Sequence, residues 1–185
     1  MGFRQARMDD IERIVDVIAD GRRAMADLGI DQWQDGYPRR SDVISDMDRG
    51  VAYVIADEAH DSPIAYAAII LDGEPDYDVI ADGDWLTTGT SADPTYTVVH
   101  RLSVATSARR RGVASRVFSE ACALAVTGGR VSVRVDTHPG NTSMQHALEA
   151  NGFVRRGTIL LSDTAAGTRE RFAYERLVGG PGSSR

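Results

Sequence analysis

The sequence predicts an α/β fold in which one central mixed sheet is flanked by about four helices. Short apolar runs of strand length alternate along the chain with segments whose apolar residues follow helical spacing. With 185 residues and 42% hydrophobic residues, the chain can bury a substantial core without disulfides or a structural metal. The predicted order is strand, two helices, three strands, helix, strand, helix and two strands.

The N-terminal segments predict one strand and two helices. Residues 3–7 form a short first strand. A helix then begins at Asp9 or Asp10 and runs to Gly29, because its apolar residues recur every three or four positions. Ser41 is a plausible cap for a second, shorter helix.

The middle of the chain predicts three strands and two unusual loops. An aromatic loop at 30–38 precedes the strands. Residues 51–57 and 63–71 are candidates for a hairpin, and 96–104 reads as a central strand because it is β-branched and apolar. The polar connection at 72–94 is long, and long loops in compact domains tend to be functional or mobile.

The C-terminal part alternates helices and strands. One helix begins near Gly112, and Asn151 with Gly152 ends a second one in the usual left-handed fashion. We expect one domain over residues 1–178 and a disordered tail at 179–185. The remaining predicted strands cover 131–135, 153–161 and 169–177, of which the last two form an antiparallel pair.

Composition narrows the class of protein. The net charge of −6 argues mildly against a nucleic-acid binder and would suit a cationic substrate. The single cysteine, Cys122, excludes an intrachain disulfide and a multi-cysteine metal cage, which fits a reducing compartment. We find neither a signal-peptide pattern nor an apolar run of about 20 residues, so we expect a cytoplasmic protein that does not enter a membrane.

A candidate anion site lies where the central strand gives way to a helix. The first turn of a helix leaves backbone N–H groups unpaired, and its macrodipole adds partial positive charge. Gly112 lets a phosphate approach closely, Ala114 stays small, and the neighbouring arginines add charge-assisted donors. A basic helix start on a solvated surface, or a nucleic-acid patch, would explain the same residues. The six residues are Arg109, Arg110, Arg111, Gly112, Val113 and Ala114.

Two motifs resemble those of the GNAT superfamily of N-acetyltransferases. The acetyl-CoA motif of that superfamily is Arg/Gln-x-x-Gly-x-Gly/Ala, and Arg109, Gly112 and Ala114 fill its fixed places. Farther along, Asn141, a helix and the Gly-Phe pair at 152–153 resemble its later motif. The resemblance implies a GNAT-like fold that uses acetyl-CoA and no metal.

The same resemblance implies which residues bind acetyl-CoA. In the family, the strand before the turn splays from its neighbour, and its free backbone groups hydrogen-bond the pantetheine arm. Asn141 would approach the cofactor from the next crossover, although Asn141 or Thr142 could also serve only as a helix cap, with Thr142 and Gln145 in a capping box. The expected set is Leu102, Ser103, Val104, Arg109, Arg110, Arg111, Gly112, Val113, Ala114, Ser115 and Asn141.

His100 is the candidate general base, because an amine must be neutral to attack a thioester and histidine titrates near neutral pH. Arylalkylamine acetyltransferases, which this chain resembles, carry a histidine at a similar strand position. A half-buried histidine that only hydrogen-bonds a neighbour is the alternative. Many family members place a tyrosine as acid four residues before the Gly-Phe pair, where this chain has Leu148, and Tyr174 is a weak substitute.

Carboxylates near these segments are further candidates. Glu74 and Asp76, in the long loop, could act as base or anchor a substrate ammonium, although loop carboxylates are more often simply solvated. Asp136 and His138 stand two apart at the end of a strand. No third ligand is identifiable for them, so we expect a structural turn there rather than a metal site.

Three aromatic residues on predicted loops, Trp33, Tyr37 and Trp85, are candidates for the wall of an acceptor pocket. Packing in the core is the alternative explanation for them.

The expected function is therefore transfer of an acetyl group from acetyl-CoA to a primary amine of a small molecule by direct attack. Cys122 lies on the apolar face of its helix, which argues against a covalent cysteine route. One alternative is a CoA-binding sensor or partner module without turnover, suggested by Leu148. Another is a protein N-terminal or lysine acetyltransferase, which would need an open groove. The chain could act as a homodimer.

Overall fold

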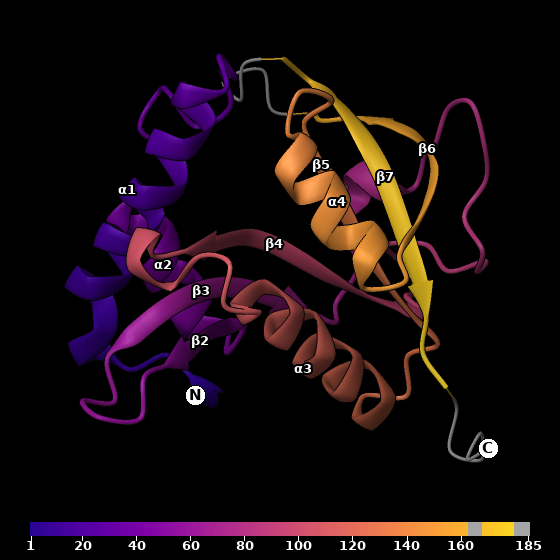
Figure 1. Cartoon of the computed structure of the whole chain (residues 1–185). Coiled ribbons are helices and arrows are strands. Elements are labelled where there is room, and N and C mark those ends of the chain that lie inside the picture. The colour runs from indigo at the N-terminus through magenta and orange to yellow at the C-terminus, as the bar shows by residue number, and fades with distance from the viewer. Residues whose placement is uncertain (163–167, 180–185) are drawn as a thin grey trace.

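The computed structural model describes residues 1–162 and 168–179, which form a seven-stranded sheet with helices packed against it (Figure 1). The predicted fold class and element order are confirmed. The strand order is β1-β2-β3-β4-β5-β7-β6. The strands are β1 (Gly2–Gln5), β2 (Ala52–Ala56), β3 (Pro63–Ile70), β4 (Tyr96–Val104), β5 (Ser132–Thr137), β6 (Val154–Leu160) and β7 (Glu170–Leu177).

Four helices accompany the sheet. Helix α1 packs on β3 and β4, whereas α3 packs on β4 and β5. In Figure 1, α3 and α4 lie in front of the strands and α1 lies to their left. The helices are α1 (Ile11–Asp27), α2 (Arg40–Asp48), α3 (Val113–Thr127) and α4 (Thr142–Ala150), and the short 3-10 turns are η1 (Met8–Asp10), η2 (Pro75–Tyr77) and η3 (Thr106–Ala108).

Two antiparallel pairs expected from the sequence are present: β2 with β3, and β6 with β7. Strand β7 also pairs with β5, so it lies between β5 and β6. The pair β4 and β5 is parallel. Every residue of β3 is buried, which is why this strand is a continuous apolar run rather than an alternating one.

The structure contradicts one predicted helix start and decides between two options for another. Ser41 lies inside α2, which begins at Arg40, and Asp42 accepts a hydrogen bond from the backbone N–H of Arg39. For α4, Asn141 is the cap, since its side chain accepts a bond from the N–H of Met144. The predicted capping box of Thr142 and Gln145 does not form, because the Gln145 side chain instead donates to the Pro139 carbonyl. Apart from residue 179, the predicted tail at 179–185 lies outside the described residues.

Among the described residues, we find no helix with the length and apolarity that crossing a bilayer requires.

Candidate active site

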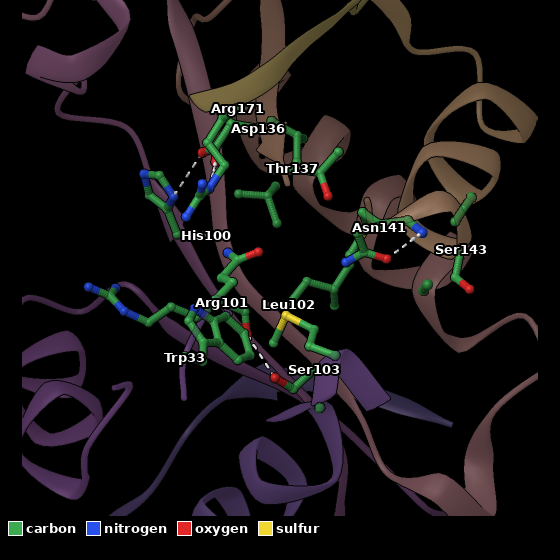
Figure 2. A pocket seen from close by; sticks show the side chains of 18 of the residues that line it. Trp33, His100, Arg101, Leu102, Ser103, Asp136, Thr137, Asn141, Ser143 and Arg171 are labelled. Atoms are coloured by element: carbon green, nitrogen blue, oxygen red, sulfur yellow. Dashed lines mark hydrogen bonds and ion pairs between the residues drawn. The ribbon is translucent and has the colours of Figure 1, made fainter. Parts of the chain in front are cut away.

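Strands β4 and β5 stop pairing halfway along their length, and a cavity opens there. Their parallel register covers only Tyr96 to Val98 on β4 and Ser132 to Arg134 on β5, yet β4 continues to Val104. The cavity has a volume of about 730 Å³. Residues that line it include Val99, His100, Arg101, Leu102, Ser103 and Val104 of β4, and Val135, Asp136 and Thr137 of β5 (Figure 2).

A bulge in β4 shapes the wall of this cavity. Ser103 pairs with Tyr66 and His100 with Ala68, so two residues of β4 stand opposite one residue of β3. Arg101, within the bulge, has a φ of 58°, a left-handed conformation that is unusual for a residue other than glycine. The bulge changes which β4 side chains face the cavity, and His100 lies next to it.

The predicted anion turn has the expected backbone geometry. Gly112 precedes α3 with a φ of 74° and makes no side-chain cap. The first N–H groups of α3 therefore have no partner within the helix, and they lie at the positive end of its dipole. A Cβ placed on Gly112 would meet no atom within 4 Å, so the space in front of this turn is open.

The three arginines of the turn differ in their surroundings. Arg109 lines the cavity, but its guanidinium donates to the carbonyl oxygens of Asp20, at 2.6 Å, and Val104, at 3.4 Å. Arg109 thus holds the turn against α1 and β4. Arg110 and Arg111 are exposed, and they are the side chains of this turn that solvent and anions reach most readily.

His100 lies between two carboxylates. Its Nε2 is 2.9 Å from Oε2 of Glu74, and its Nδ1 is 3.6 Å from Oδ1 of Asp136. Burial raises the pKa of Glu74, but the hydrogen bond and the electrostatic attraction of His100 outweigh burial, so this pKa lies below its usual value. The structure thus brings the two candidate catalytic residues into direct contact.

Asp136 is the residue of this cluster whose role the sequence did not indicate. Instead of a simple turn, it lines the cavity, with its side chain 9% exposed. Its Oδ1 accepts a hydrogen bond of 2.7 Å from the hydroxyl of Tyr77, and its Oδ2 is 3.8 Å from Nε of Arg171. Burial and the adjacent Asp136 charge raise the pKa of Tyr77, so that hydroxyl remains a donor. The sequence feature that could have indicated this role is the position of Asp136 near the end of β5, which lies beside the central strand β4.

Two of the three predicted aromatic wall residues line the cavity. Trp33 and Tyr37 do so from the loop between α1 and α2. Trp85 does not line the cavity. Its indole N–H donates to the Tyr77 carbonyl, and its ring lies 4.3 Å from the Arg134 guanidinium. We therefore leave Trp85 out of the candidate acceptor site.

Neither the position of the family's tyrosine, Leu148, nor the substitute Tyr174 is in the cavity wall. Leu148 is fully buried in the hydrophobic core. The hydroxyl of Tyr174 points to Glu149 of α4, at 3.4 Å, and Tyr174 packs in the same core. Asp76 does line the cavity, but its carboxylate already accepts a bond from the backbone of Ser162.

The start of α4 forms the opposite side of the cavity from His100. In Figure 2, Asn141 and Ser143 lie on one side, whereas His100, Asp136 and Arg171 gather on the other. His138, just before this helix, accepts a hydrogen bond from the N–H of Gly140 through Nδ1, so it belongs to the turn.

A family model described as the acetyltransferase (GNAT) family matches residues 18–153, which is most of the chain. The chain belongs to the GNAT acetyltransferase family. The comparison with curated proteins gives no match for this acetyltransferase.

Solved structures agree with this assignment. A GNAT-family acetyltransferase from Streptococcus agalactiae 2603 is 30% identical, with a TM-score of 0.77 over 95% of this chain and 94% of that one. A GNAT-family acetyltransferase from Listeria monocytogenes 4b F2365 is 18% identical, with a TM-score of 0.67 over 95% and 94% of the two chains. The NatB acetyltransferase complex, solved with CoA and MES, is 13% identical, with a TM-score of 0.65 over 97% and 100%. The last two similarities concern the fold alone.

The family uses acetyl-CoA, and the backbone of this acetyltransferase fits that group in two places. Beyond Val98, the edge of β4 that faces β5 has no strand partner among residues 1–162 and 168–179, so its N–H and C=O groups can bond an amide-bearing arm. The uncapped start of α3 at Gly112 can bind phosphate oxygens.

Proposed function

We propose that this acetyltransferase moves an acetyl group from acetyl-CoA to a primary amine of a small molecule by direct attack. The observation that carries the proposal is the placement of His100. It lies on the wall of the cavity, where β4 and β5 separate, with one ring nitrogen bonded to Glu74. A base at this position is close to both the free strand edge and the acceptor side.

The proposed cofactor site extends from the β4 edge to the start of α3. Leu102, Ser103 and Val104 offer backbone groups to the pantetheine arm. The N–H groups of Val113, Ala114 and Ser115, after Gly112, bind phosphate oxygens, and Arg110 and Arg111 add positive charge. Arg109 acts mainly by holding the turn, because its guanidinium is bonded to two carbonyl oxygens. Asn141 contributes from the start of α4, which it also caps.

The proposed proton chemistry uses His100 with Glu74. When Nε2–H donates to Glu74, Nδ1 carries the lone pair and can accept a proton from the amine. Glu74 then stabilises the imidazolium that forms, as an orienting carboxylate does in other histidine pairs. Acetyl-CoA supplies an activated thioester. A thiol with a pKa of about 8.5 leaves without an obligatory acid, which is consistent with Leu148 in place of a tyrosine.

Direct attack is favoured over an acyl-cysteine route. Cys122 is half-buried on α3 and does not line the cavity. Burial also raises its pKa, which lowers the fraction of the reactive thiolate.

The acceptor side combines aromatic rings with carboxylates. Trp33 and Tyr37 line it, together with Glu74, Asp76 and Asp136. Aromatic faces and carboxylates both favour a cationic amine with an apolar body. A concave site of this kind supports a small-molecule acceptor over a protein N-terminus or lysine.

Two measurements test the proposal. Isothermal titration at physiological salt should detect binding of acetyl-CoA and CoA, and no binding would refute it. Thiol release should rise when primary amines such as phenethylamine and spermidine are added. Binding without amine-dependent release would favour the CoA-binding sensor or partner module, and release only with peptide N-termini or lysine peptides would favour protein acetylation.

A further inference from the structure

Arg101 connects the bulge of β4 to two other segments of the chain. Its Nη1 donates to both oxygens of Asp46 on α2, each at 3.0 Å. Its Nε donates to the hydroxyl of Tyr37 at 2.7 Å. Tyr66, opposite on β3, donates its hydroxyl to the same Asp46 carboxylate. One guanidinium thus joins β4, α2 and residues 28–39 between α1 and α2, which we call the acceptor loop.

The network joins an ion pair to two tyrosine hydroxyls, and much of it is buried. Asp46 is 2% exposed and Tyr66 is buried completely. Burial lowers the pKa of Arg101, but the neighbouring Tyr37 and Asp46 outweigh burial and raise it overall, so the guanidinium stays protonated. A buried ion pair of this kind often adds little net stability, because removing both charges from water is costly. We expect this pair instead to fix the relative positions of the segments that it joins.

Two residues on the segments that this network joins have strained backbones. Trp33 on the acceptor loop has a φ of 68° and Arg101 on the bulge has a φ of 58°. Both line the cavity. Left-handed conformations of bulky residues persist only where surrounding contacts enforce them, and they tend to occur at functional sites. Arg101 supplies contacts to both segments, because it lies within the β4 bulge and its guanidinium bonds Tyr37 on the acceptor loop.

We propose that Arg101 is a positioning residue for acetyl transfer, which fixes the acceptor loop relative to His100 through Tyr37 and Asp46. It acts through other groups rather than on the reacting atoms. In this role it sets the distance between the amine, held against Trp33 and Tyr37, and the adjacent His100. The effect of Arg101 on catalysis rests on the proposed function. Its effect on the position of the acceptor loop does not depend on that function.

The structural consequence is testable without any substrate. The chain has two tryptophans, and a Trp85→Phe background leaves Trp33 as the reporter on the acceptor loop. In that background, Tyr37→Phe removes only the hydroxyl, and Asp46→Asn removes the charge. We expect acrylamide quenching of Trp33 to increase about twofold in each variant, because the loop opens locally more often.

Asp10→Asn is the matched control. Asp10 is also buried, and it accepts two bonds from one arginine, Arg4, at 2.7 and 3.0 Å, but it does not line the cavity. Acrylamide quenching of Trp33 in the Asp10→Asn variant should equal that in the Trp85→Phe parent. Unchanged quenching in both Tyr37→Phe and Asp46→Asn, or an equal increase in Asp10→Asn, would overturn the proposal.

Kinetics separate positioning from a general loss of structure. With the amine that releases the most thiol, Tyr37→Phe should raise the KM for amine about fivefold while the Kd for CoA stays constant. Equal KM values for the variant and the parent would contradict the positioning role. If the wild-type chain neither bound CoA nor released thiol while Trp33 quenching responded as expected, the proposed function would fail and the role of Arg101 in holding the loop would stand.

Discussion

The Nε2 atom of His100 lies 2.9 Å from Oε2 of Glu74, although the two residues are 26 positions apart in the chain. The contact joins the central strand to the long loop before it. In the tautomer that the proposed chemistry uses, Nε2–H donates to Glu74 and Nδ1 is left as the acceptor. This pair therefore gives the most direct tests of the proposed chemistry.

Replacing His100 with glutamine should reduce kcat about 100-fold or more, because the amine loses its base. The Kd for CoA, measured by titration calorimetry, should stay near the wild-type value, since the proposed cofactor contacts near His100 come from the β4 backbone. His60→Gln, on an exposed turn, is the control and should leave both quantities unchanged. Equal loss of CoA binding would instead assign His100 to the cofactor site.

Replacing Glu74 with glutamine should lower kcat about tenfold, because the imidazolium loses its carboxylate partner. The same change has a defined effect on stability against pH. Burial raises the pKa of Glu74, but His100 outweighs it, so the folded-state pKa lies below its ordinary value of 4.5. The wild-type chain should therefore be more stable than Glu74→Gln above about pH 4.5, and the difference should vanish as the pH falls through the folded-state pKa.

Urea unfolding at a series of pH values measures this difference. Glu12→Gln, at an exposed position of α1, is the control. A stability difference between the wild-type chain and Glu74→Gln that does not change with pH in the acid range would contradict the contact.

Replacing Gly112 with alanine should weaken CoA binding about tenfold, because a Cβ would occupy the open space in front of the start of α3. A left-handed residue other than glycine also costs about 1 kcal/mol. Gly129, after the other end of α3, has a φ of 70° against 74° for Gly112, and likewise no atom lies within 4 Å of an added Cβ. Gly129→Ala should therefore lose similar stability while its Kd for CoA stays unchanged, and equal Kd changes in the two variants would contradict the anion site.

Replacing Gly21 with alanine should raise the KM for amine several-fold while changing stability little. Alanine favours the helix by about 1 kcal/mol over glycine. Its Cβ, however, would lie 3.0 Å from Oγ of Ser103, so that side chain must give way, and the new methyl group would fill space in the cavity wall beside the ring of Trp33, at 3.4 Å. Steady-state kinetics over a range of amine concentrations measures the effect. An unchanged KM would contradict a role of this part of the cavity wall in binding the amine.

Local chemistry explains what could be predicted. The β-branched run of β4, the glycine before α3 and the Asn-Gly end of α4 each determine their own conformation, so these elements were predicted close to their observed bounds. The cap at Asn141 was one of two options left open, since Asn141 and Thr142 are both suitable caps. The cap at Ser41 was wrong, because α2 begins at Arg40 and Asp42 supplies the hydrogen bond at its start.

Asp136 and Asp46 mark the limit of that reasoning. Asp46 lies within a largely polar helix and binds Arg101, 55 positions away, through a bend in β4 that no local pattern encodes. Asp136 reaches His100 only because β4 and β5 are parallel neighbours that separate after three paired positions. Trp85 was predicted from its loop position to line the acceptor pocket, but its ring packs against the Arg134 guanidinium. Local sequence does not reveal such a distant partner.

By itself, the sequence determined the element order, the turn at Gly112 before α3 and the family, because hydrophobic period, helix ends and glycine conformation act over a few residues. Only the tertiary structure decided which groups surround His100 and what holds the acceptor loop. Those contacts depend on strand register, on the β4 bulge and on the point where two strands part. Each of these is the result of packing over the whole sheet.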